Sequence, residues 1–121
     1  MPMIPIIVGP DEGTMIEGPV GGPATIKLRG AQTNGALARY ETVAGPGQGP
    51  QHLLRWEDEI FCVLDGALRF QLNDEIRIVG EGACVFIRRG TPHSHQNSGD
   101  EAARLRVQPS PCAMGVRRYS S

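Results

Sequence analysis

The stretch of sequence that decides the fold is Gly82-Ala83-Cys84-Val85-Phe86-Ile87-Arg88-Arg89-Gly90-Thr91-Pro92-His93-Ser94-His95-Gln96-Asn97. A short apolar run leads into an Arg-Gly turn signal, and two histidines then follow at alternate positions. Side chains two residues apart on a β-strand lie on the same face. The pattern therefore predicts a strand, a turn and a second strand that presents His93, His95 and Asn97 together.

A stretch nearer the N-terminus carries complementary groups, in the order His52-Leu53-Leu54-Arg55-Trp56-Glu57-Asp58-Glu59. On a strand that continues from here, Glu59 would share its face with Phe61 and Val63. A barrel that aims these faces inward brings His52, Glu59 and His93 towards one point. Two histidines and one carboxylate form the facial triad that holds non-haem iron with open positions. The sequence thus predicts a candidate metal site, while Glu57 and Asp58 are expected to be carboxylates of a turn or rim.

The rest of the chain falls into short alternating runs, which fit the period of a strand better than the 3.6-residue period of a helix. These runs are residues 25–28, 38–43, 61–64, 67–72, 76–79, 84–87 and 103–107. Turn signals such as Asp65-Gly66 and Asn73-Asp74 separate them. Many short strands with regular turns predict an all-β sandwich or closed barrel. We expect residues 25–121 to form one barrel domain and residues 1–24 to be an N-terminal extension or edge strand.

Length and charge narrow the class of protein. A chain of 121 residues is long enough to bury the core of a single domain. The net charge of -1 gives no basic footprint for a nucleic acid. No segment resembles a signal peptide or approaches the roughly 20 apolar residues of a membrane helix. We expect a soluble, cytoplasmic protein that binds a small-molecule substrate, and neither a nucleic acid nor a membrane.

The cysteines and aromatic residues invite structural interpretations. Cys62, Cys84 and Cys112 are an odd number without close spacing, which indicates neither a disulfide framework nor a zinc knuckle. Cys62 and Cys84 lie inside apolar runs, so we expect them to be small core residues. We expect the aromatic residues Trp56, Phe61, Phe70 and Phe86 to belong to the core as well.

Together the two stretches resemble the paired motifs of the cupin superfamily, in particular small single-domain cupins of the quercetin-dioxygenase-like and polyketide-cyclase-like kinds. The resemblance implies a jelly-roll β-barrel (a double-stranded β-helix), often paired as a homodimer. It also implies one divalent metal ion (Zn, Fe, Ni, Mn or Cu) with His52, Glu59 and His93 as ligands. Leu54 stands where the family usually has a further histidine ligand, so the implied site is incomplete.

Two other positions depart from the family pattern. His95 stands where the family generally has an aromatic residue, and Arg88 stands where it generally has proline. His95 could replace the lost ligand or act as an acid or base beside the metal, because its ordinary pKa suits proton transfer near neutral pH. The alternative is a packed histidine bonded to Asn97 or to a backbone carbonyl. Arg88 and Arg89 are most simply a solvated surface pair, although an arginine near the pocket could clamp a carboxylate.

Three functional interpretations follow. The first is a redox-neutral cyclase, isomerase or dehydratase that acts on a polyketide-like or other enolisable intermediate, with His95, His93 and Glu59 as catalytic groups. The second is a metal-dependent dioxygenase that uses Fe, Mn, Ni or Cu. The third is a non-catalytic barrel that binds a small molecule. We favour an enzyme over a binding protein and narrowly favour redox-neutral chemistry, because the changes at Leu54 and His95 together indicate a repurposed pocket.

Overall fold

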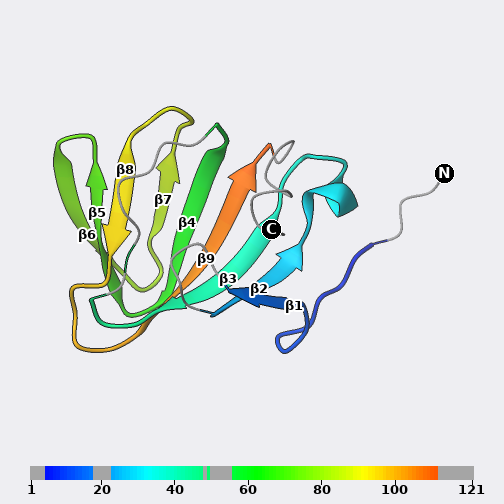
Figure 1. Ribbon diagram of the computed structural model, residues 1–121, viewed down its shortest axis with the longest axis horizontal. Helices are drawn as coiled ribbons and strands as arrows, with labels where there is room; N and C mark the ends of the chain where they lie inside the picture. Colours follow the sequence, from blue (N-terminus) through cyan, green and yellow to red (C-terminus); the bar gives the residue numbers. More distant parts are fainter. Residues whose placement is uncertain (1–4, 18–22, 48, 50–55, 112–121) are drawn as a thin grey trace.

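The computed structural model describes residues 5–17, 23–47, 49 and 56–111, and these residues form two antiparallel β-sheets (Figure 1). The strands are β1 (Thr14–Glu17), β2 (Pro23–Leu28), β3 (Arg39–Ala44), β4 (Asp58–Asp65), β5 (Ala67–Leu72), β6 (Glu75–Gly80), β7 (Cys84–Ile87), β8 (His93–Gln96) and β9 (Ala103–Ser110). A short 3-10 helix, Gly30–Thr33, connects β2 to β3. Within the described ranges there is no helix with the length and apolar character needed to span a membrane.

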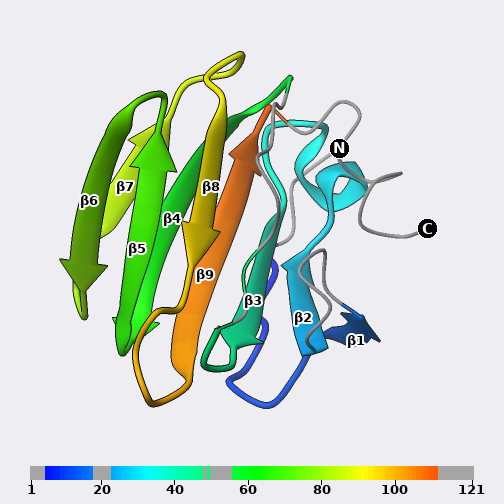
Figure 2. The same ribbon diagram turned by 60° about the vertical axis from the view of Figure 1, so that its left-hand side comes forward.

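The larger sheet has six strands in the order β1-β2-β3-β9-β4-β7, and the smaller has three in the order β6-β5-β8. Figure 2 shows the smaller sheet packed in front of the β7–β4–β9 end of the larger one. The alternating pattern of the sequence predicted an all-β sandwich or barrel, and the family resemblance implied a jelly roll; the structure confirms this architecture. All seven predicted runs form strands, while β1 and β8 complete the sheets.

The core lies between the two sheets and follows the alternation along each strand. On β4 the side chains of Phe61 and Val63 are buried, and on β5 those of Leu68 and Phe70. The rings of Phe61 and Phe70 meet edge to face, with their centroids 5.4 Å apart. Aromatic pairs favour this arrangement, so this contact fastens one sheet to the other.

Four other residues that we expected in the core lie outside it. Trp56 is 71% exposed and Phe86 is 59% exposed. Cys62 is half-buried and Cys84 is exposed. Phe86 precedes the buried Ile87 by one residue on β7, and neighbouring residues of a strand point to opposite faces. These short apolar runs do not reveal which of their residues face the core.

Candidate active site

The site joins the two sheets through Glu59 on β4 and His93 on β8. Glu59 Oε1 lies 3.2 Å from His93 Nε2, and both side chains are almost fully buried, at 2% and 1% exposed. Glu59 faces inward because it alternates with the outward-facing Asp58 and Ile60. The sequence predicted that Glu59 and His93 converge, and the structure places them in contact; their roles as ligands or catalytic groups stay predictions.

A backbone hydrogen bond fixes the protonation of one nitrogen of His93. Its Nδ1 lies 2.9 Å from the carbonyl oxygen of Thr91. A carbonyl oxygen can only accept, so Nδ1 donates and carries a hydrogen. Nε2 is then the nitrogen that faces Glu59, and a lone pair on Nε2 cannot bond to an ionised carboxylate. A proton or a cation between Nε2 and Oε1 would join these two atoms directly.

The same two atoms fit a divalent metal ion. Ligands about 2.0 to 2.2 Å from one ion, at angles near those of octahedral or tetrahedral coordination, lie roughly 2.9 to 3.5 Å apart. The 3.2 Å separation of Oε1 and Nε2 falls in this range. A metal-bound histidine also usually donates its second ring nitrogen to a backbone carbonyl or a carboxylate, as Nδ1 of His93 does to Thr91.

The described part of the chain supplies only some of the donors that the sequence predicted. It contains no group of three or more His, Cys, Asp or Glu side chains that could hold a metal ion. The predicted third ligand, His52, lies outside the described residues, and so does Leu54. That Glu59 and His93 hold a metal ion together with His52 stays a proposal. The distance between Glu59 Oε1 and His93 Nε2 supports it.

His95 lies on the same buried face of β8 as His93, beside two aromatic rings that also contact each other. Its ring centroid is 5.3 Å from that of Phe61 and 5.6 Å from that of Phe70. The ring of His93 also approaches Phe61, at 6.2 Å. The two imidazoles therefore share an aromatic wall that keeps water away from them. Such surroundings suit a proton-transfer group as well as a packed side chain.

Asn97 ties the loop after β3 to the end of β8. Its side-chain nitrogen donates to the carbonyl oxygens of Ala44, at 2.9 Å, and Glu101, at 2.7 Å, while its side-chain oxygen accepts from the amide of Gly99, at 3.0 Å. The backbone oxygen of Asn97 also accepts from the amide of Gly47, at 2.7 Å.

Gly49 continues this contact between the loop and β8. A Cβ added at Gly49 would lie 2.7 Å from Gln96 Cα and would also strike the carbonyl oxygen of His95. The loop backbone therefore lies directly against the strand that carries both histidines. Only a glycine allows an approach this close without a shift of the backbone.

Two acidic residues beside Glu59 have different surroundings. We expected Glu57 at a turn or rim, but it is buried, at 4% exposed. Its spacing of two residues from Glu59 was the signal that could have placed it on the inner side. Asp58 faces outward, and its carboxylate accepts from Arg89 through the backbone amide, at 2.8 Å, and Nε, at 3.1 Å. The side-chain hydrogen bond from Arg89 lowers the pKa of Asp58.

Arg88 and Arg89 are both exposed. The interpretation of the two arginines as a surface pair is therefore confirmed. Arg89 forms an ion pair with Asp58, the first residue of β4, at 3.1 Å between Arg89 Nε and Asp58 Oδ1. This contact holds the start of β4, and with it Glu59, against the turn that follows β7.

Comparison with protein families decides the identity of the fold. The model described as "Cupin domain" matches residues 39–107, more than half of the chain and the segment that contains Glu59, His93 and His95. The chain is a cupin. No curated protein matches it.

Solved structures show the same cupin fold. The polyketide cyclase RemF from Streptomyces resistomycificus has a TM-score of 0.75 at 18% identity, over 88% of this chain and 80% of that one. An RmlC-like cupin from Shewanella frigidimarina has a TM-score of 0.77 at 12% identity, over 95% and 98%. The cupin domain of Schizosaccharomyces pombe Cnp3 has a TM-score of 0.61 at 20% identity. The match covers 69% of this chain but only 61% of the Cnp3 chain. Identities this low show the fold alone.

Proposed function

We propose that this cupin is an enzyme that carries out redox-neutral chemistry (a cyclisation, isomerisation or dehydration) on an enolisable, polyketide-like small molecule. The observation that carries the proposal is the buried contact of 3.2 Å between Glu59 and His93, in which Nδ1 of His93 is committed to Thr91. A buried acid–base pair in direct contact is suited to remove and return protons. The likeness in fold to a polyketide cyclase agrees with this class of substrate.

Each residue of the pair has a defined part in proton transfer. Oε1 of Glu59 takes a proton from a carbon that lies between two carbonyl groups, and Nε2 of His93 takes up or returns that proton at the neighbouring position. Thr91 holds the ring in place, so only Nε2 changes its protonation. Phe61 and Phe70 exclude water beside His95, which preserves the enolate for an intramolecular reaction.

A divalent ion fits the same pair of residues and would polarise a substrate carbonyl when bound. Glu59 and His93 would then hold the ion, and His95 would be the group left to move protons. His95 is two residues after His93 on β8, so both side chains point to the same interior. The proposal therefore gives His95 a part that does not depend on the lost ligand at Leu54.

The test measures proton exchange and oxygen uptake on one set of samples. Each variant is mixed in D2O with a series of alkyl and aryl β-diketones, and NMR follows the replacement of the central C–H while an electrode follows O2. We expect exchange above the buffer rate without O2 uptake, and a loss of about 100-fold or more in Glu59→Gln. Glu75→Gln, the same change on the exposed strand β6, should keep the full rate.

The other outcomes identify the other functions. The spacing of Oε1 and Nε2 also favours a metal-dependent dioxygenase, and O2 uptake in proportion to diketone loss would establish that chemistry instead. Binding of a diketone without exchange or O2 uptake would show a non-catalytic barrel. The metal content of each sample, by inductively coupled plasma mass spectrometry, shows whether Glu59→Gln loses a metal ion that Glu75→Gln retains.

A further inference from the structure

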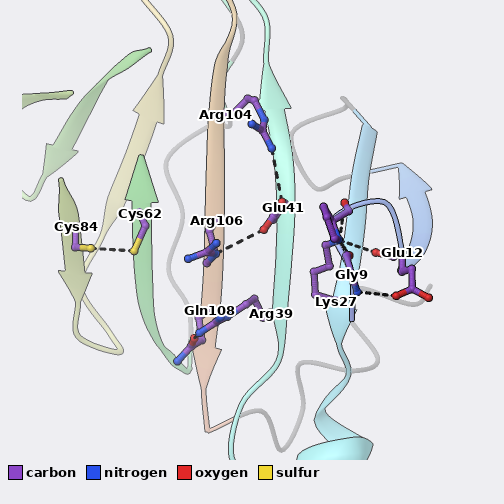
Figure 3. A network of polar contacts seen from close by, with 11 residues as sticks. Gly9, Glu12, Lys27, Arg39, Glu41, Cys62, Cys84, Arg104, Arg106 and Gln108 are labelled. Atoms are coloured by element: carbon purple, nitrogen blue, oxygen red, sulfur yellow. Dashed lines mark hydrogen bonds and ion pairs between the residues drawn. The ribbon is translucent and has the colours of Figure 1, made fainter. Parts of the chain in front are cut away.

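Two cysteines meet on the outer face of the larger sheet. Cys62 on β4 and Cys84 on β7 are directly opposite in the antiparallel register, and their sulfur atoms lie 2.9 Å apart (Figure 3). Cys84 is exposed and Cys62 is half-buried. Because Cys62 alternates with the buried Phe61 and Val63, this pair lies on the opposite face of β4 from Glu59.

The hydrogen bonding of the two strands shows that this pair can be bridged. The amide of Val63 donates to the carbonyl oxygen of Ala83 at 2.9 Å, which marks a hydrogen-bonded position. Positions alternate along an antiparallel pair, so Cys62 and Cys84 occupy a non-hydrogen-bonded position, where Cα atoms are about 4.5 Å apart. Disulfides span Cα separations of about 4.4 to 6.8 Å. Neither strand therefore has to move for a bond to form.

We propose that Cys62 and Cys84 are a redox site that forms a reversible disulfide when the protein meets a peroxide or a small-molecule disulfide. The site lies outside the candidate active site and does not depend on the proposed function. The sequence spacing of the cysteines gives no sign of it, because the pairing comes from the register of β4 against β7.

The chemistry assigns one part to each sulfur. The thiolate of the exposed Cys84 attacks hydrogen peroxide; an S–O bond forms, the O–O bond breaks, and the hydroxide that leaves takes a proton to become water. Cys62 loses its thiol proton and attacks the sulfenic acid of Cys84; the S–S bond forms and the S–O bond breaks, which releases a second water. The two sulfur atoms together give up the two electrons that reduce the peroxide.

The environment of the pair agrees with this order of events. The hydrogen bond between the two sulfur atoms raises the pKa of Cys62, so Cys62 keeps its proton until Cys84 has been oxidised. On the other side of β4, Arg106 of β9 is directly opposite Cys62. Figure 3 shows the row from Cys84 through Cys62 to Arg106 across three adjacent strands. The guanidinium of Arg106 lowers the pKa of Cys62, but by less than the hydrogen bond raises it, so the exposed Cys84 remains the sulfur that reacts first.

The disulfide would fasten an edge of the sheet. β7 is the last strand of the larger sheet, and β4 is the strand it pairs with in the described register. A bond between Cys62 and Cys84 closes a loop that contains β5 and β6, because both strands lie between these residues in the chain. Oxidation therefore stabilises both the edge strand and the connection to the smaller sheet.

The experiment uses the full chain with Cys112→Ser, so that Cys62 and Cys84 are the two remaining thiols. After treatment with hydrogen peroxide, the intact mass should fall by about 2 Da, and a thiol titration should lose two groups. The melting temperature should rise by about 5 to 15 °C, and dithiothreitol should reverse all three changes. Amides of β7 should exchange with D2O more slowly in the oxidised form.

Two further variants in the same background are the matched controls. With Cys62→Ser, peroxide should instead add oxygen to Cys84, with a mass gain and no rise in melting temperature; Cys84→Ser should show neither bond nor stabilisation. The proposal is overturned if the protein with both cysteines gains oxygen without a disulfide, if the bond forms between two molecules, or if oxidation leaves the melting temperature and β7 exchange unchanged.

Discussion

At the scale of single residues, His93 and His95 show how neighbours on one strand face can differ in chemistry. His93 is fixed by Thr91 and faces the carboxylate of Glu59. His95 lies beside the rings of Phe61 and Phe70, which contact each other. The surroundings of His93 set its imidazole beside a carboxylate. Those of His95 exclude water from an imidazole that can exchange a proton.

Replacement of His95 by phenylalanine separates packing from proton transfer. The new ring packs against Phe61 and Phe70 and removes a buried polar group, so the free energy of unfolding should fall by no more than about 1 kcal/mol. If His95 moves protons, the exchange rate of a β-diketone should drop by about 100-fold while metal content is unchanged. An unchanged rate at equal stability would make His95 a packing residue.

At the scale of secondary-structure elements, the turn between β4 and β5 depends on Gly66. Gly66 has a φ of +86°, and a Cβ there would lie 3.0 Å from Ala103 Cα and 3.1 Å from the carbonyl oxygen of Ala102. Gly82, in the turn before β7, has the same φ of +86° but nothing within 4 Å of an added Cβ. The two glycines thus share one left-handed backbone conformation, and they differ in what an added Cβ would contact.

Alanine at these two positions should destabilise the fold to different extents. Gly82→Ala should cost about 1 to 2 kcal/mol, because alanine disfavours a left-handed backbone. Gly66→Ala should cost about 1 to 3 kcal/mol more, because the added methyl also meets the backbone of β9. Urea denaturation of both variants measures the difference. Equal losses would show that the turn moves away from β9 without cost.

The strands could be predicted from the sequence, but their pairing across the sheets could not. Alternation located the runs at 61–64 and 84–87, because a strand has a period of two whatever it pairs with. The thiol contact depends on register between β4 and β7, whose cysteines are 22 residues apart in the chain. The exposure of Phe86 depends on which face of β7 the core takes. Both are tertiary properties that no local pattern carries.

At the scale of the whole molecule, stability depends on the contact between the two sheets. Phe70 is fully buried at the centre of that contact, whereas Phe86 is mostly exposed on the edge strand β7. Phe70→Ala should lower the free energy of unfolding by about 3 to 5 kcal/mol, the usual cost of such a cavity. Phe86→Ala should cost less than about 1 kcal/mol. Similar losses for both would mean that β7 packs against something in solution.

The sequence predicted those residues of the candidate site that occupy inward positions of strands which the barrel brings together. Glu59 and His93 each occupy inward positions of their own strand, and the barrel expected from the turn signals brings those strands together. The burial of Glu57 was missed because this residue lies just before the start of β4, although its spacing of two residues from Glu59 continues the alternation of that strand. The hydrogen bond from His93 to Thr91 depends on the shape of the turn before β8, which the sequence does not encode in any pattern.

The split of the site between two sheets has a thermodynamic consequence. Glu59 belongs to the six-stranded sheet and His93 to the three-stranded sheet, so a ligand that touches both binds only when the sheets are docked. By mass action such a ligand must stabilise the folded chain, by about 2.7 kcal/mol at a concentration 100 times its dissociation constant. Thermal melting of the unmodified cupin is therefore a direct assay for its ligand, in which metals and candidate substrates can be compared without any knowledge of the reaction.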